Sequence, residues 1–159
     1  AVCSYVPVRP VFSVEVRLEQ QLDFFQDFYG DFDRARAEEM LSALNIARSA
    51  KFRALSKGNQ EKVQLVLVMS RRAKLYLLDE PLGGVDPAER EYILNTILHN
   101  YSEDAALVLS THLIGDIEKV LDEVIFLKDG SVMRQVGVDG LREETGTSVD
   151  AYCREAYKC

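Results

Sequence analysis

The sequence has no tryptophan, only three cysteines and no long apolar run. Cys3, Cys153 and Cys159 are odd in number and lack metal-ligand spacing, which predicts free thiols in a reducing compartment. The longest stretches without charge, such as 92–102, are far shorter than the roughly 20 apolar residues that span a bilayer. No signal peptide is visible at the start. Any role at a membrane is therefore expected to come through a partner protein.

Runs of basic residues are also absent. The net charge is −7, and the 19 lysines and arginines are scattered rather than grouped. This argues against a nucleic-acid binder, because such proteins neutralise many phosphates, but it leaves room for a nucleotide at a local site. With 159 residues, 47% hydrophobic and 28% charged, the chain is expected to form one globular domain, or part of a larger one.

The first 70 or so residues are predicted to be mostly helical. A short strand over 2–6 opens the chain, and because the sequence begins inside it, a fragment of a longer protein is expected. Apolar spacing then predicts one helix from Leu18 to Gly30 and a second starting near Asp33. A third helix follows "LSKGNQEK"; its apolar residues run nearly all round from 63 to 69, which predicts a buried helix.

Beyond residue 72 the pattern changes to alternating strands and helices. The predicted strands are 74–79, 105–110, 123–128 and 131–136, and the predicted helices begin at Pro87 and near Leu113. Asp86 is expected to be the N-cap before Pro87, with Glu89 as a capping-box acid, and "KDGS" predicts a hairpin turn. This alternation indicates an α/β fold, a parallel sheet flanked by helices. The expected parts are 1–72, with the helical subdomain; 73–137, the α/β core; and 138–159, a helical tail.

Two adjacent carboxylates end the strand "LYLLDE". In P-loop NTPases a hydrophobic strand that ends in Asp holds Mg²⁺, and a following Glu orients or deprotonates the attacking water. Asp79 and Glu80 fit that arrangement. The competing interpretation is a strand that simply runs into a polar loop, since short motifs often match by chance.

Two further positions suit the same chemistry. His112 follows the apolar strand "LVLS", and ligands bind where parallel strands end on the same side of a sheet; a loop histidine is the alternative. Ser56 and Gly58 stand at the start of the buried helix, where free N–H groups and the helix dipole attract an anion. A plain serine N-cap is the alternative there.

Four segments occur in an order and spacing similar to the ABC-type ATPases: "LSKGNQ" at 55–60, "LYLLDEP" at 75–81, "GGVD" at 83–86 and "STH" at 110–112. The chain resembles the nucleotide-binding subunit of a bacterial ABC transporter over nearly its whole length, and "SKGNQEK" is similar to ABC-2-type exporter subunits. The resemblance implies a partial P-loop NTPase (ABC ATPase) fold with an N-terminal helical subdomain. It also implies ATP and Mg²⁺ as ligands, and ATP hydrolysis that drives export when a head-to-tail dimer closes.

The resemblance implies a role for each motif. The signature segment, which would contact the γ-phosphate of ATP on the opposite subunit, consists of Leu55, Ser56, Lys57, Gly58, Asn59 and Gln60. Asp79 would be the Walker B acid near Mg²⁺, and Glu80 the general base or water-positioning residue. Asp86 would be the D-loop acid that reaches across the dimer, and His112 the switch histidine on the γ-phosphate. The segment 15–50 would contact a transmembrane permease subunit, which would hold the protein at the cytoplasmic face of the membrane.

The sequence also departs from the family. It contains no G-x-x-x-x-G-K-[ST] phosphate loop (Walker A), and Val8 stands where the Q-loop glutamine is expected, so no role is carried over to it. The backbone N–H groups and the lysine of that loop offset most of the triphosphate charge. This chain alone is therefore expected neither to bind ATP tightly nor to hydrolyse it, whereas a longer parent protein would be a working ATPase.

Three other functions stay open. The chain could be a degenerate, non-catalytic subunit that donates only its signature segment to a partner. It could be a soluble ABC ATPase outside transport, although the compact spacing and the absence of a coiled-coil insertion favour transport. It could also be a metal-dependent hydrolase that uses Asp79, Glu80 and His112, for which no convincing third ligand is found. The transported substrate does not follow from the sequence.

Overall fold

The structure is a computed structural model that describes residues 3–6, 15–101 and 104–157. By its internal contacts the chain divides into two compact units, Ala1–Thr111 and His112–Cys159, and each is described by itself. Cys3 and Cys153 are free thiols, as predicted, whereas Cys159 and the Q-loop position Val8 lie outside the described residues. Among the described helices, none combines the length and the apolar character needed to cross a membrane.

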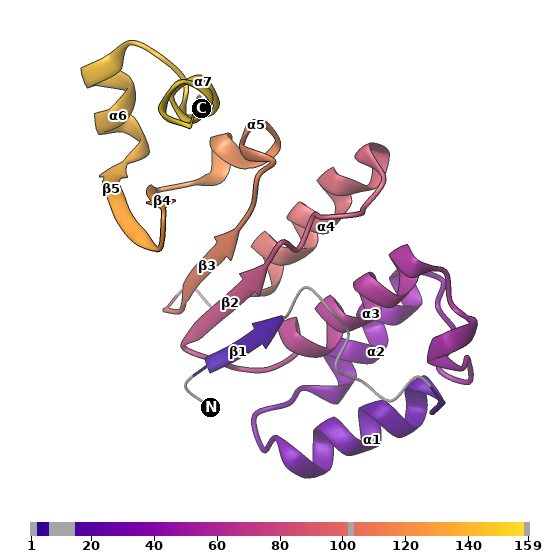
Figure 1. Ribbon diagram of the computed structural model, residues 1–159. Helices are drawn as coiled ribbons and strands as arrows, with labels where there is room; N and C mark the ends of the chain where they lie inside the picture. The colour runs from indigo at the N-terminus through magenta and orange to yellow at the C-terminus, as the bar shows by residue number, and fades with distance from the viewer. Residues whose placement is uncertain (1–2, 7–14, 102–103, 158–159) are drawn as a thin grey trace. The chain divides into compact units, whose positions relative to one another are not determined.

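A three-stranded parallel sheet forms the centre of the first unit. Its strands are β1 (Cys3–Val6), β2 (Leu75–Asp79) and β3 (Ala106–Ser110), with β2 in the middle (Figure 1). The register places Val6 beside Leu78 and Asp79 beside Ser110. Since the strands are parallel, their carboxyl ends meet at one edge of the sheet, which is where the sequence placed its candidate site.

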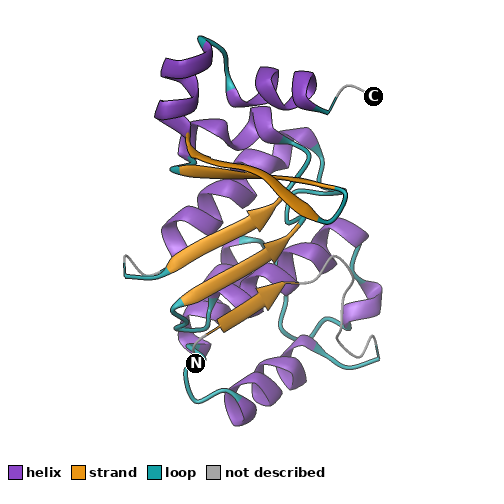
Figure 2. Cartoon of the chain, turned by 60° about the vertical axis from the view of Figure 1, so that its left-hand side comes forward, coloured by secondary structure: helices purple, strands orange, loops and turns teal. Residues whose placement is uncertain are grey.

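The first unit also contains four α-helices (Figure 2). They are α1 (Leu18–Phe28), α2 (Arg34–Ala43), α3 (Lys57–Met69) and α4 (Pro87–Asn100). The prediction of a buried third helix is confirmed, because every residue from Lys62 to Met69 is buried. The Ser4 hydroxyl donates to the Val68 carbonyl oxygen at 3.0 Å, so α3 packs directly against β1.

The two faces of the sheet differ in exposure. Tyr76 and Leu78 of β2 point to a buried face and are at most 2% exposed. On the opposite face, the register aligns Tyr5, Leu77 and Val108 in one row across the three strands. Tyr5 and Val108 are still 52% and 49% exposed. That apolar row is only partly covered by the described residues.

The second unit is an antiparallel hairpin with short helices. Its elements are α5 (Ile114–Ile117), a 3₁₀ turn (Glu118–Val120), β4 (Glu123–Lys128), β5 (Ser131–Gly137), α6 (Val138–Thr145) and α7 (Val149–Ala156). The predicted turn is confirmed, with Asp129 and Gly130 both at positive φ, as a two-residue hairpin requires. A small core gathers Phe126, Leu141 and Val149.

The structure adds detail to two predictions for this unit and shows that the extent of one predicted helix was wrong. The strand at 123–128 pairs with β5 in a second, two-stranded sheet instead of extending the parallel one. The helix expected near Leu113 is a single turn of α-helix followed by a 3₁₀ turn, and Val120 remains 40% exposed. The tail is helical, as predicted, and is divided into two helices because Gly146 takes a left-handed conformation (φ 66°) and ends the first of them.

The Glu118 side chain connects the 3₁₀ turn to α6 and α7 through hydrogen bonds. Its carboxylate accepts hydrogen bonds from the backbone N–H groups of Val149 (3.0 Å) and Asp150 (3.3 Å) and from Nη2 of Arg142 (2.8 Å). Burial alone raises the pKa of Glu118, but the Arg142 guanidinium and the two N–H groups outweigh it and lower the pKa. The first turn of α7 is therefore capped by an ionised side chain from another element.

Glu118→Gln is expected to lower the free energy of unfolding by about 1–3 kcal/mol at neutral pH, because the three donors lose a charged acceptor. Since the pKa is lowered on folding, this stabilisation is present above the unfolded-state pKa of about 4.3 and is lost as the pH falls through the folded-state pKa. Urea unfolding at several pH values measures both effects. The exposed Glu143→Gln on α6 is the control; equal losses in the two variants would contradict this role.

Candidate functional site

Asp79 and Glu80 leave the sheet beside the end of β3. The Ser110 hydroxyl donates to Oδ1 of Asp79 at 2.6 Å. The backbone N–H of Glu80 lies 3.0 Å from the Ser110 hydroxyl and 3.1 Å from the Ser110 carbonyl oxygen. The two acids are therefore held at the carboxyl edge of the sheet by a serine on the neighbouring strand.

The loop that follows these acids (residues 80–86, called the acid loop below) turns sharply. Glu80 has a φ of 47°, which is uncommon for a residue other than glycine. The N–H of Gly83 donates to the Glu80 carbonyl oxygen at 2.9 Å. A Cβ on Gly83 would lie only 3.1 Å from that same oxygen. Little space is left in this turn, so the backbone of Glu80 depends on the position of the residues after it.

The oxygen atoms at this edge of the sheet suit a hard cation such as Mg²⁺ that also binds phosphate and water oxygens. Carboxylate and hydroxyl oxygens come together at Asp79 and Ser110, and Mg²⁺ is usually held by one or two carboxylates together with phosphate and water oxygens. Within 3–6, 15–101 and 104–157, no group of three or more His, Cys, Asp or Glu side chains could hold a metal ion. The donor set fits Mg²⁺ bound with a phosphate, and the metal-hydrolase alternative gains no support.

Asp86 closes the acid loop and starts α4, as predicted. Its Oδ1 accepts from the N–H of Ala88 at 2.9 Å, and Pro87 occupies the first helical position. The capping-box role expected for Glu89 was wrong. Its carboxylate lies 2.7 Å from Nζ of Lys62 on α3, so it forms an ion pair between two helices instead of bonding back to the N-cap.

The signature segment (residues 55–60) forms the start of α3. The Ser56 hydroxyl accepts from the N–H of Asn59 at 3.3 Å, which confirms it as N-cap. Ser56 and Lys57 are exposed, and a Cβ on Gly58 would meet no atom within 4 Å. Nε2 of Gln60 donates to the carbonyl oxygens of Phe52 and Leu55 at 3.2 Å each. In this chain the Gln60 side chain stabilises the turn before the helix, while Ser56 and Gly58 face open space.

The start of α3 and the acid loop lie together within the first unit. Gly84 has a φ of 77°, and a Cβ on it would lie 3.3 Å from Oε1 of Glu61 and 3.4 Å from Nζ of Lys57. Sequence reasoning missed Glu61 and Lys62. The available signal was a lysine at the edge of an apolar run, since a charged residue is almost never buried without a partner.

The position of His112 relative to the acids stays a prediction. It follows Ser110 by two residues but begins the second unit. The side chain is exposed, and it takes part in an interaction within the structure. Its proposed contact with a γ-phosphate therefore depends on the family resemblance.

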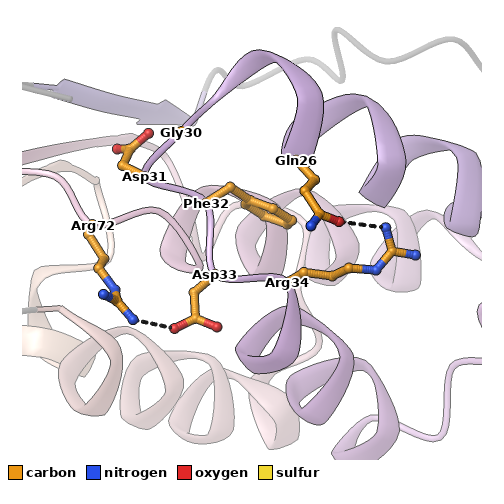
Figure 3. A pocket seen from close by; sticks show the side chains of 7 residues that line it. All are labelled: Gln26, Gly30, Asp31, Phe32, Asp33, Arg34 and Arg72. Carbon is orange, nitrogen blue, oxygen red and sulfur yellow. Dashed lines mark hydrogen bonds and ion pairs between the residues drawn. The ribbon is translucent and has the colours of Figure 1, made fainter.

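A pocket of about 260 Å³ in the first unit is lined by none of these residues (Figure 3). Its lining residues are Gln26, Gly30, Asp31, Phe32, Asp33, Arg34 and Arg72. Its charged groups already have partners: Nη2 of Arg72 lies 2.9 Å from Oδ2 of Asp33, and Nη1 of Arg34 lies 3.1 Å from Oε1 of Gln26. With its charges paired inside the protein, this pocket is not the candidate site.

Comparison with known proteins agrees with this arrangement. The family model for ABC transporters matches residues 4–83, half of the chain. The ABC transporter ATP-binding protein YtrB of Bacillus subtilis (strain 168) is 32% identical over 141 residues, covering 88% of this chain and 48% of YtrB. The phosphonates import ATP-binding protein PhnC 2 of Roseobacter denitrificans is 30% identical over 131 residues, covering 79% of this chain and 47% of that protein. The chain thus spans about half the length of these curated relatives.

A solved structure described as the ATP binding subunit of an ABC transporter is similar in fold. Its TM-score is 0.82 at 28% identity, and the match covers 98% of this chain and 68% of that one. The predicted α/β fold with a parallel sheet flanked by helices is confirmed by this neighbour and by the strand order described above.

Proposed function

The chain belongs to the ABC transporter ATP-binding family, and from this premise we propose that it supplies two parts of an ATP-hydrolysing site. Asp79 and Glu80 would act on the nucleotide bound to this same subunit. The signature segment would contact the nucleotide bound to a second subunit. The observation that carries the proposal is the Asp79–Ser110 pair at the carboxyl edge of the parallel sheet, followed at once by Glu80.

Each acid has a distinct task in this proposal. Asp79, oriented by the Ser110 hydroxyl, would help to hold Mg²⁺. Glu80 orients the attacking water and accepts its proton. When bound, Mg²⁺-ATP would supply the bond to be cleaved, and the Asp79 carboxylate would balance part of the positive charge of its Mg²⁺. By the family resemblance, His112 would donate a hydrogen bond to the terminal phosphate.

The signature segment and Asp86 act across a dimer in this proposal. Ser56 and Gly58 stand at the start of a 13-residue helix, where unpaired backbone N–H groups favour an anion. Both face open space in the first unit, which supports contact with a phosphate held by another subunit. Asp86 is exposed at the end of the acid loop and would reach the same partner.

The remaining partners are proposed from the family alone. The helical segment 15–50 would contact a transmembrane permease, so that the protein would work at the cytoplasmic face of a membrane. Export is proposed because "SKGNQEK" is similar to ABC-2-type exporter subunits, whereas the name of PhnC 2 describes an importer. A second candidate function is a non-catalytic subunit that donates only its signature segment to a partner.

Phosphate release tests the proposal. The chain is joined behind the amino-terminal segment of an ABC ATP-binding subunit with an intact phosphate loop, giving what is called the fused protein below. We expect steady ATP turnover that EDTA abolishes, because Mg²⁺ offsets the phosphate charge. A fused protein that binds ATP but releases no phosphate would favour the non-catalytic donor.

A further inference from the structure

We propose that Lys57, Glu61 and Lys62 are positioning residues that tie the start of α3 to the acid loop and to the first turn of α4. Through them, a phosphate that binds the signature segment from a second subunit would act on the acids of the same chain. The inference rests on the proposed function of these two segments, but its test does not require nucleotide.

The first link is the packing of a charged pair against Gly84. Glu61 and Lys57 are one helical turn apart, with Nζ 3.8 Å from Oε1. A Cβ on Gly84 would lie 3.3–3.4 Å from these two side-chain ends. The positive φ of Gly84 already disfavours a larger residue. Both the backbone conformation and the neighbouring side chains therefore hold the acid loop at this point.

Glu61 occupies this place at an energetic cost. Its side chain is 23% exposed, and its Oε2 is buried without a hydrogen-bond partner. Burial raises the pKa of Glu61, and the charge of Lys57 opposes this only in part. A buried, unsatisfied carboxylate oxygen requires an explanation, and we attribute it to the position of this side chain beside Gly84 of the acid loop.

The second link is the ion pair between Lys62 and Glu89. The two charges are 2.7 Å apart, and the Lys62 side chain is only 10% exposed. Lys62 starts the buried run of α3, and Glu89 lies in the first turn of α4, just after the acid loop. Because a buried lysine depends on its partner, α3 and the start of α4 are held in a fixed relation.

The tight turn of the acid loop connects Gly84 to Glu80. The N–H of Gly83, next to Gly84, donates to the Glu80 carbonyl oxygen at 2.9 Å. The N–H of Glu80 in turn bonds to Ser110, which orients Asp79. A shift of the start of α3 would thus be passed to Gly84, and from there through the hydrogen bonds of Gly83, Glu80 and Ser110 to both acids.

Amide hydrogen exchange of the full 159-residue chain, followed by NMR, tests this inference. The reporters are the hydrogen-bonded N–H groups of Glu80, Gly83 and Glu89. In Glu61→Ala and in Lys62→Met we expect them to exchange at least about tenfold faster, because local opening becomes easier. The conservative variants Glu61→Gln and Lys62→Arg should bring exchange back to within about threefold of the wild type.

Two further variants keep the result interpretable. Lys74→Met removes an ion pair with Asp104 in which both partners are more than 60% exposed, and it should leave the three reporters unchanged. Glu89→Gln removes the other half of the Lys62 pair at a side chain that is 48% exposed. It should reproduce the faster exchange even if Lys62→Met does not fold.

Unchanged exchange at the three reporters in Glu61→Ala and Glu89→Gln would overturn the inference. Exchange that is faster by the same factor at the β2 amides would also overturn it, since Lys57, Glu61 and Lys62 would then stabilise the whole fold rather than position the acid loop. Neither result bears on ATP turnover by the fused protein, and a failure of that turnover leaves the exchange result intact.

Discussion

Glu80→Gln in the fused protein is expected to lower kcat for ATP hydrolysis by about 10²–10⁴-fold, the usual contribution of a positioned general base. Glutamine keeps the size of the side chain and the left-handed backbone turn but does not accept the proton of the attacking water. The hydrogen bonds from the Glu80 N–H to Ser110 are made by the backbone, so the variant should fold normally. Binding of ATP should change by less than about threefold, because the side chain acts on water and not on the phosphates.

Steady-state phosphate release and nucleotide binding together measure this effect. Glu91→Gln is the matched control, since Glu91 is an exposed glutamate on α4 outside the proposed site. Its turnover should equal that of the unsubstituted fused protein. If Glu80→Gln keeps more than about a tenth of the wild-type kcat, Glu80 is not the base.

Arg71→Met is expected to lower the free energy of unfolding by about 3–5 kcal/mol, as is typical when one partner of a buried ion pair is removed. Nη2 of Arg71 lies 3.1 and 3.2 Å from the two carboxylate oxygens of Asp31, and the two side chains are 10% and 15% exposed. The guanidinium also lies 3.9 Å from the centre of the Tyr29 ring, and its Nη1 donates to the Cys3 carbonyl oxygen at 3.4 Å. Without Arg71, Asp31 loses the guanidinium that pairs with its carboxylate, and the loop before α2 loses this attachment to β1.

Urea unfolding measures this loss, and the next residue supplies the control. Arg72 also pairs with an aspartate, Asp33, but its side chain is 73% exposed. Arg72→Met should therefore cost less than about 1 kcal/mol. Adding Asp31→Asn to Arg71→Met should recover part of the loss, because it removes the largely buried charge that the Arg71 guanidinium compensated. Equal losses at Arg71 and Arg72 would contradict the account of this pair.

The sequence predicted the first unit well because its signals are local. The N-caps at Ser56 and Asp86, the buried run of α3 and the acids at the end of β2 depend on residue spacing within one element. The second unit was harder to predict. A single helical turn before a hairpin has too few residues to show a period. The apolar run at 124–127 in β4 is continuous, which is the pattern typical of a buried parallel strand.

Contacts between residues far apart in the chain could not be predicted from the sequence. Glu89 fits a capping box by spacing, but only the fold brings Lys62 to it. The Ser110 hydroxyl was part of a recognised motif, yet its bond to Asp79 follows from the register of β2 and β3. The roles of the signature segment and of His112 come from the family, and the residues themselves left simpler interpretations open.

The affinity of the chain for Mg²⁺-ATP, with and without a joined phosphate loop, tests the central claim most directly. Equilibrium dialysis should give a Kd weaker than about 1 mM for the chain alone and at least about 100-fold tighter for the fused protein, since the N–H groups and lysine of that loop bind most of the triphosphate charge. Micromolar binding by the chain alone would contradict the claim, because the phosphate cradle would then lie within these 159 residues.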